Sequence, residues 1–166
     1  MARSETTLGA IAYRPLTGPW SEALELFRFA GAPAPAVDQI DSGWGAWDGE
    51  RARGALLAER AGTSAMLHGP VVVAPSDAPP ETAFEIAGGL LAAVLEHAAG
   101  QGVTTLFTRP QGLDRIWVRN GFIPVPEAEL PKALRGRPGV GLYGWRGGAA
   151  LWSTMGRGVP RARAGR

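Results

Sequence analysis

The sequence contains no cysteine and only two histidines, and these absences exclude several kinds of site. Without cysteine the chain cannot form disulfides, bind zinc through thiolates or use a thiolate nucleophile. With two histidines, a histidine-rich metal site is not expected. The phosphate-loop pattern G-x-x-x-x-G-K-[ST] and the nucleophile elbow G-x-S-x-G are also missing, so a P-loop nucleotidase and an α/β-hydrolase have no support.

Long apolar runs are missing as well. No uninterrupted apolar stretch reaches the roughly 18 residues that suggest a membrane span. The first residues lack the apolar segment of a signal peptide, so we expect a cytoplasmic protein. The chain has 166 residues, of which 45% are hydrophobic and 19% are charged. This length and composition predict a single globular domain, which we place at residues 1–156.

The net charge of +2 is unevenly distributed along the chain. Residues 157–166 form a basic tail, and without it 15 acidic residues outnumber 13 basic ones. We expect this tail to be flexible, with contact to an acidic protein surface as the alternative. A nucleic-acid-binding module is the weakest candidate, because the body is not basic and its aromatic residues do not alternate with basic ones.

Hydrophobic spacing and turn residues predict the first half of the fold. Residues 8–16 suit a strand, and apolar residues at helical spacing predict a helix within 20–31. Asp48-Gly49 is a hairpin turn signal between two further strands. Residues 64–75 predict a long strand, in which Gly69-Pro70 indicates a bulge or an irregular edge.

The second half begins with the clearest helix, residues 81–102, whose apolar positions follow a 3.6-residue period. Gly88-Gly89 in its middle suggests a neighbour that packs closely there. A short buried strand (103–110), a short helix (112–121) and a C-terminal hairpin that turns at residues 146–148 follow. Strands in a meander followed by a helical crossover predict an α/β (α+β) fold with a mixed sheet.

The short helix carries the clearest family resemblance. The run from Ile116 to Phe122 reads I-W-V-R-N-G-F, and it resembles the aromatic-x-x-x-G-F box of the GNAT superfamily of N-acyltransferases. In such a box the helix ends at the glycine, here Gly121, and the phenylalanine turns inward. The aromatic residue one turn earlier, here Trp117, then faces the cofactor cleft.

The resemblance covers roughly residues 8–152 and implies a twisted, mostly antiparallel central sheet with flanking helices. It also implies an acyltransferase that moves an acetyl group from acetyl-CoA, or another acyl-CoA, to an amine of a small molecule or a protein. By position, main-chain groups of Val71, Val72, Val73 and Ala74 pair with pantetheine. Thr82 and Ala83, at the start of the main helix, face the pyrophosphate.

The sequence departs from the family at the pyrophosphate loop. Members usually end the fourth strand with [QR]-x-x-G-x-[GA], whose N–H groups hold the pyrophosphate. This chain has V-V-V-A-P-S-D-A-P-P-E instead, with three prolines that lack an N–H and two acidic side chains. Arg115 or Arg119 is a candidate to supply the positive charge that this loop lacks.

A second departure is Trp117, which stands where many members have a tyrosine that acts as general acid. An indole N–H is a hydrogen-bond donor without useful acidity. Another group or water therefore protonates the leaving thiolate, or no such step occurs. The alternative interpretation of Trp117 is an aromatic residue in the core or the cleft wall.

The histidines differ in their expected roles. His68 lies on the long strand where family members place a general base or a substrate contact, and an imidazole can accept a proton from an ammonium group. The alternative for His68 is a half-buried sheet residue without chemistry. His97 lies near the C-terminal end of the main helix, where interaction with the helix dipole explains it.

Two further clusters have both a functional and a structural interpretation. Asp38, Asp41 and Glu59 could form an acidic pocket for an amine, or they are solvated charges at strand ends. Four tryptophans could line a groove for an apolar substrate or a protein partner, or they pack in the core; these are Trp44, Trp47, Trp145 and Trp152.

Two hypotheses for function follow. The first is a GNAT-fold acyltransferase in which His68 or a carboxylate accepts the proton of the amine. The second is a GNAT-like protein without catalysis that serves as an accessory or assembly subunit. The proline-rich acidic loop and Trp117 favour the second, and free N–H groups converging on a cavity within residues 74–83 would favour the first.

Overall fold

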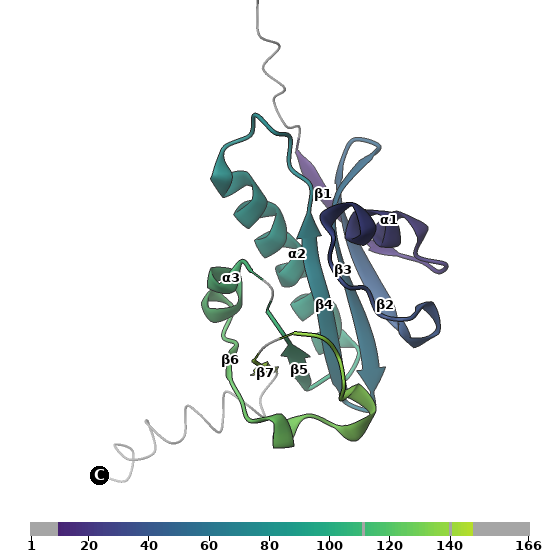
Figure 1. Cartoon of the computed structure of the whole chain (residues 1–166), viewed down its shortest axis with the longest axis vertical. Coiled ribbons are helices and arrows are strands. Elements are labelled where there is room, and N and C mark those ends of the chain that lie inside the picture. The colour runs from purple at the N-terminus through teal and green to yellow at the C-terminus, as the bar shows by residue number, and fades with distance from the viewer. Residues whose placement is uncertain (1–9, 111, 140, 148–166) are drawn as a thin grey trace, which may run out of the picture.

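The computed structural model describes residues 10–110, 112–139 and 141–147 (Figure 1). Its elements follow the predicted order of strands and helices. In chain order they are β1 (Ile11–Leu16), α1 (Ser21–Ala30), η1 (Val37–Gln39), β2 (Ser42–Asp48), β3 (Arg51–Ala61), β4 (Ser64–Val72), α2 (Pro80–Gly100), β5 (Thr105–Thr108), α3 (Asp114–Arg119), β6 (Ile123–Pro124), η2 (Glu127–Glu129), η3 (Lys132–Leu134) and β7 (Tyr143–Arg146). The three η segments are single turns of 3₁₀ helix.

The strands form one seven-stranded sheet in the order β1-β2-β3-β4-β5-β7-β6. The pair β4–β5 is parallel and the other neighbouring pairs are antiparallel. The parallel pair follows from the crossover through α2, since a chain that returns by a helix re-enters the sheet in the same direction. The mixed α/β sheet with flanking helices, predicted from the sequence, is confirmed.

Helices cover both faces of the sheet. In Figure 1, α2 runs along one face, close to β4, while α1 lies on the other side of the central strands. Buried residues of α2 pack with Leu56 and Leu67 in the larger core, and Phe27 of α1 packs with Leu57 and Val71 in the second core. The η2–η3 segment extends this second layer over β4 and β5, where Leu134 packs against Met66.

The main helix α2 is a core helix in this fold. By length and composition alone it could cross a membrane. Six of its residues are buried, and these also belong to the larger core: Ile86, Ala87, Leu90, Leu91, Val94 and Ala98. The apolar character of α2 is thus accounted for by packing on the sheet.

The double glycine in α2 has the close neighbour that the sequence suggested. A Cβ at Gly89 would lie 2.1 Å from Cζ of Tyr13 on β1, whereas a Cβ at Gly88 meets nothing within 4 Å. Tyr13 also donates a hydrogen bond from its hydroxyl to the Glu85 carbonyl, at 3.4 Å. Glycine at position 89 therefore allows β1 and α2 to approach each other.

This asymmetry predicts opposite effects for two neighbouring substitutions. We expect Gly88→Ala to raise the free energy of unfolding by about 1 kcal/mol, because alanine favours the helix and meets open space. Gly89→Ala should lower it by about 1 kcal/mol or more, because the methyl group displaces Tyr13. Urea unfolding of both variants measures this, and equal stabilisation by both would contradict the packing described here.

The aromatic-x-x-x-G-F box folds as the sequence predicts at its glycine and phenylalanine. Helix α3 gives way to Gly121, whose N–H donates to the Val118 carbonyl, and the Phe122 N–H donates to the Trp117 carbonyl. Phe122 is buried and packs edge-to-face on Trp117, with ring centroids 5.0 Å apart. This packing fixes α3 against the sheet.

The irregularity predicted at Gly69-Pro70 is a bulge in β4. Its register with β3 shifts there, because Ala55 pairs with Val71 but Leu57 pairs with His68. Gly69 has φ of 96°, and a Cβ there would lie 3.0 to 3.2 Å from three neighbouring atoms. Only glycine adopts this backbone freely in so little space, and the bulge redirects the strand directly after His68.

Some expectations fall on residues outside the described part of the chain. The second arm of the C-terminal hairpin, Trp152 and the basic tail 157–166 are among them. The domain boundary at residue 156 therefore stays a prediction.

Candidate active site

A cavity opens where the two parallel strands separate. The pairing of β4 with β5 ends at Leu67 and Thr108, whose hydroxyl donates to the Leu67 carbonyl at 3.4 Å. Beyond this point β4 continues to Val72 while β5 has ended. The cavity has a volume of about 340 Å³ and is lined by the end of α1, by β4 from Met66 to Val72, by the chain after β5 and by Arg137-Pro138. Ligands of α/β sheets bind at such carboxyl ends of parallel strands.

His68 is the first β4 residue past this separation, and it contacts a buried carboxylate. Its Nε2 lies 2.6 Å from Oε2 of Glu59, which comes from the neighbouring strand β3. Both side chains point to the α1 face, and they are 10% and 4% exposed. His68 thus lines the cavity, and Glu59 lies buried behind it.

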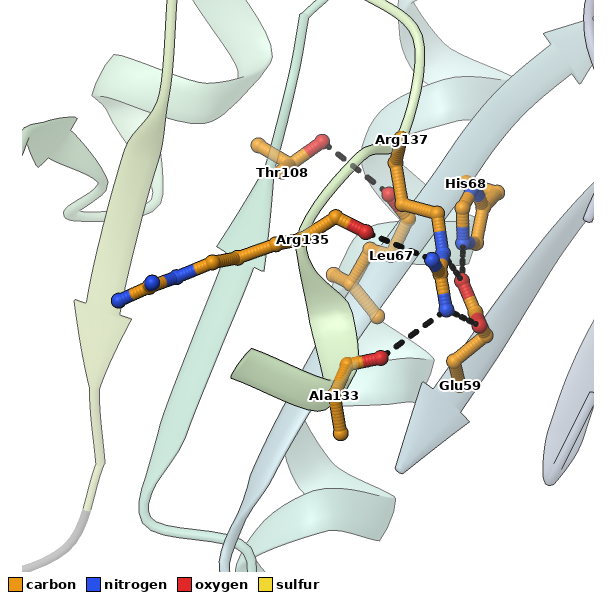
Figure 2. Close-up of polar contacts among 7 residues, drawn as sticks. All are labelled: Glu59, Leu67, His68, Thr108, Ala133, Arg135 and Arg137. Carbon is orange, nitrogen blue, oxygen red and sulfur yellow. Dashed lines mark hydrogen bonds and ion pairs between the residues drawn. The ribbon is translucent and has the colours of Figure 1, made fainter. Parts of the chain in front are cut away.

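Arg137 completes this cluster from a distant part of the chain. It donates from Nε to Oε2 of Glu59 at 2.8 Å and from Nη2 to Oε1 at 2.6 Å. Its remaining bonds go to the carbonyls of Arg135 and Ala133, at 2.8 and 3.1 Å. Figure 2 shows the guanidinium reaching down from the loop after η3 to the carboxylate, beside the ring of His68. A fork of this kind holds a carboxylate in one fixed orientation.

Burial and these contacts together set the charges. Burial raises the pKa of Glu59, but the hydrogen bonds from Arg137 and His68 outweigh it, so the net pKa is lowered. The pKa of His68 is also lowered, because burial of the imidazolium outweighs the attraction of Glu59. At neutral pH the cluster is therefore a carboxylate neutralised by a guanidinium, beside a neutral imidazole.

The hydrogen-bond pattern fixes which nitrogen of His68 is basic. A carboxylate can only accept, so Nε2 carries the proton and donates it to Glu59. Nδ1 then holds the free lone pair. In Figure 2 one ring nitrogen faces Glu59 and the other points away from it. His68 lines the cavity, and Nδ1 is the ring nitrogen that Glu59 does not engage.

Arg109 is the second arginine in the cavity wall, and it directly follows β5. It pairs with Glu127 through both Nη atoms, at 2.5 and 2.7 Å, and Nη1 also donates to the Gly141 carbonyl at 3.0 Å. The Arg109 side chain is 9% exposed, whereas that of Glu127 is 62% exposed. The buried charge at the cavity is therefore the cation, and its partner lies in solvent.

The residues expected to bind pantetheine lie partly at the cavity. Val71 and Val72 line it, whereas the side chain of Val73 lies in a shallow depression beside α1. The Val73 N–H donates to the Arg53 carbonyl at 2.7 Å, so this group is already used by the sheet. Ala74 is half-buried and does not line the cavity.

Two N–H groups of the connection from β4 to α2 are used in internal turns. The Ala78 N–H donates to the Pro75 carbonyl and that of Thr82 to the Pro79 carbonyl. The cavity reaches Val72 but none of the residues 74–83, so Thr82 and Ala83 do not line it. In the part of the chain that the structure describes, the N–H groups of this connection do not converge on that cavity.

The three residues expected on the short helix are spread around it. Trp117 is 1% exposed and packs in the larger core, which supports the core-packing interpretation. Arg115 and Arg119 are exposed on α3 and do not line the cavity. Their contact with a bound pyrophosphate stays a prediction.

The expected acidic pocket does not form. Asp38 is exposed on η1, and Asp41 borders a separate hollow with Ala58 and His97 on the α2 side of the sheet. Glu59 lies on the opposite face and is engaged by Arg137 and His68. Asp41 is exposed just before β2, whereas Glu59 is buried within β3, so the two do not form one pocket.

The described tryptophans also fail to form one groove. Trp145 is buried in the larger core and stacks on Phe122, and Trp44 packs edge-to-face on His97. Trp47 lies under Arg14 near the outer edge of the sheet. Core and edge packing account for these residues, and His97 has an aromatic neighbour in addition to the helix end.

Sequence reasoning identified His68 but missed Arg109 and Arg137. A signal for Arg109 was present, because a residue directly after a parallel strand lies at the same sheet edge as the residue after its neighbour. Glu59 was noticed, but its pairing with His68 depends on the register between β3 and β4. Nothing in the local sequence around Arg137 indicates its partner.

Comparison with known proteins identifies the fold. No protein-family model and no curated protein sequence matches the chain. Among solved structures, a GNAT-family acetyltransferase from Staphylococcus aureus superposes with a TM-score of 0.62 and 15% identity, over 82% of this chain and 99% of that one. The ribosomal-protein-S18-alanine N-acetyltransferase from Escherichia coli gives 0.60 and 13%, over 82% and 94%.

A third similar structure is the N-acetylglutamate synthase from Neisseria gonorrhoeae, complexed with coenzyme A and N-acetyl-glutamate. Its TM-score is 0.62 at 16% identity, over 83% of this chain but only 35% of that one. At such low identity the likeness concerns architecture. The chain has the fold of the GNAT acetyltransferases.

Proposed function

We propose that this protein is an acyl-CoA-dependent N-acyltransferase that acetylates an amine in the cavity between β4 and β5. The observation that carries the proposal is His68 in the wall of that cavity, hydrogen-bonded through Nε2 to the buried Glu59, with the imidazole neutral and one nitrogen free. A neutral imidazole facing a cavity at the open end of two parallel strands is suited to remove a proton from an amine.

The cavity fits the reactive end of an acyl-CoA. Past Leu67 the edge of β4 that faced β5 has no strand partner among the described residues, and an unpaired strand edge can hydrogen-bond to the amides of a pantetheine arm. Val71 and Val72 would hold that arm, and Arg115 or Arg119 would approach the phosphates. When bound, acyl-CoA supplies an acyl thioester for transfer.

The residues of the chain have separate tasks in this proposal. His68 accepts the proton of the acceptor ammonium at Nδ1, which leaves the amine free to attack. Glu59 holds the ring through Nε2 and stabilises the imidazolium that forms. Arg137 keeps Glu59 ionised and in place. Trp117 has no part in proton transfer, because its ring lies in the core.

A second candidate function is a non-catalytic protein with the same fold. The observation in its favour is the connection after β4, where prolines and internal turns occupy the main chain near the start of α2. A protein of this kind would keep the fold and bind a protein partner without binding acyl-CoA. The titration described next separates the two.

Calorimetric titration with acetyl-CoA at moderate salt tests the proposal. We expect a micromolar dissociation constant, with Arg115→Ala or Arg119→Ala weakening it roughly tenfold if that residue holds a phosphate. Arg51→Ala, at an exposed site on β3, is the matched control and should bind as the wild type does. Absence of heat up to millimolar acetyl-CoA would contradict the proposal and favour the non-catalytic protein.

A further inference from the structure

The charged groups in the cavity wall are all basic or neutral. They are Arg109, Arg137 and His68, and no acidic residue of the part of the chain that the structure describes lines the cavity. Glu59 lies behind Arg137 and His68, and Glu127 is mostly in solvent. An ammonium group alone would find no carboxylate to pair with here, whereas an anionic group would find two guanidinium groups.

Both arginines keep donors that the chain does not use. Arg109 makes three hydrogen bonds through its Nη atoms. Its Nε is buried and has no partner among the described residues. Its three Nη bonds also leave one N–H on Nη2 unused among the described residues, and a guanidinium donor of this kind suits an anionic acceptor. Arg137 engages its two Nη atoms and Nε in four hydrogen bonds, which leaves one N–H on Nη1 unused in the described part of the chain.

The two arginines are held next to each other by the loop that follows η3. Arg137 and Pro138 of this loop line the cavity. Gly139 packs so closely on Arg109 that a Cβ there would lie 2.6 Å from the Arg109 Cβ. This contact places the base of the Arg109 side chain beside the loop that carries Arg137, and both arginines line the same cavity.

The other side chains in the wall are apolar, while basic groups and main chain supply most of its exposed surface. Side chains such as Phe27, Met66, Val71 and Leu113 surround the cavity. A ligand that satisfies the whole surface therefore has an apolar body and one anionic group that accepts hydrogen bonds in a plane. A carboxylate is such a group, because two of its oxygens can accept from guanidinium forks.

We propose that the cavity binds a small carboxylic acid with an apolar body, whose carboxylate is recognised by Arg109 and Arg137. Only the role of this ligand rests on the proposed function. Under that function the ligand is the acyl acceptor, and it carries both an amine and a carboxylate, as an amino acid does. His68 then faces the amine while the arginines hold the carboxylate.

Two probes that differ only at the anionic group test the proposal without requiring turnover. N-acetyl-leucine and N-acetyl-leucinamide have the same apolar body and acyl group, but only the first carries a carboxylate. We expect calorimetry to show at least tenfold tighter binding of the carboxylate. Arg109→Met should reduce this preference below threefold. Glu127→Gln should increase it, because the neutral amide competes less for the Arg109 guanidinium.

Glu127→Gln changes an exposed residue and serves if Arg109→Met does not fold. Raising NaCl from about 50 to about 500 mM should also lower the preference of the wild type several-fold, since salt screens the attraction. Equal binding of both probes, no binding of either, or a preference that neither variant alters would overturn the proposal.

The acetyl-CoA titration distinguishes this failure from failure of the proposed function. Binding of acetyl-CoA without a carboxylate preference would refute only the acceptor class. A carboxylate preference without binding of acetyl-CoA would refute the acyltransferase and leave the carboxylate site in place.

Discussion

Replacing Arg137 with methionine is expected to lower the free energy of unfolding by about 3 kcal/mol at pH 8, because it leaves the Glu59 carboxylate buried without its cation. The loss should shrink as the pH falls toward 5. Without the guanidinium, burial raises the pKa of Glu59, and the pKa of His68 rises because it becomes the only partner. A proton taken up by either Glu59 or His68 relieves the unpaired charge in the folded state. Protonation of either group therefore makes the loss of stability smaller at low pH.

The free energy of unfolding of the wild type itself should fall as the pH falls. Its Glu59 and His68 both have a lowered pKa in the folded state, so the unfolded chain binds more protons on acidification. The contribution of His68 to stability begins to fall once the pH drops below about 6.5, the pKa of an unfolded histidine. The contribution of Glu59 begins to fall below about pH 4.3, the pKa of an unfolded glutamate. Urea unfolding from pH 8 to pH 4 measures both curves.

Two comparisons make this test specific to the buried pair. Arg115→Met, at an exposed site on α3, should change stability by no more than about 0.5 kcal/mol at any pH. Glu59→Leu in the Arg137→Met background should recover most of the loss, because no charge then remains buried. An Arg137→Met variant that loses less than about 1 kcal/mol with no pH dependence would contradict the pairing.

Replacing His68 with glutamine is expected to lower kcat/KM by roughly 100-fold or more, the range attributed to general-base catalysis. Glutamine can still donate a hydrogen bond to Glu59, but it has no basic lone pair near Nδ1. Steady-state assay of thiol release from acetyl-CoA, with the acceptor found in the binding experiments, measures the change.

The pH profile adds a second readout. In the wild type the acid limb of kcat/KM should lie below pH 6.5, because the pKa of His68 is lowered by burial. The glutamine variant should lose this limb and keep only the one set by the acceptor amine. Gly88→Ala, which meets open space on α2, should retain wild-type activity. A glutamine variant within threefold of the wild type, or with an unchanged acid limb, would rule out His68 as the base.

Local patterns were sufficient to predict most of the architecture. Helical periodicity, the Asp48-Gly49 turn and the Gly69-Pro70 irregularity are encoded in short stretches, and each is found where it was expected. The close neighbour of Gly89 was also predictable in kind, since two glycines inside a strong helix need a packing reason. The identity of that neighbour, Tyr13, was not, because it depends on how β1 is placed in the sheet.

The site was less predictable, because its key contacts are not local. Arg137 and Glu59 are 78 positions apart, and no periodicity links them. An arginine in a proline- and glycine-rich loop is commonly solvated, so its sequence context points away from burial. For Trp117 the local sequence is ambiguous, because its spacing suits both a cleft wall and a core position. Only its packing with Phe122 and Trp145 identifies the core position.

The long reach of Arg137 also has a consequence for timing during synthesis. Glu59 and His68 leave the ribosome together, but the guanidinium that keeps Glu59 charged belongs to a segment made much later. A nascent chain that ends before Arg137 holds the imidazole and the carboxylate without the charge balance that they need. Under the proposed function, the Glu59–His68 pair would therefore reach its working charge state only after the loop after η3 has docked. Activity would then appear only once this part of the domain has folded.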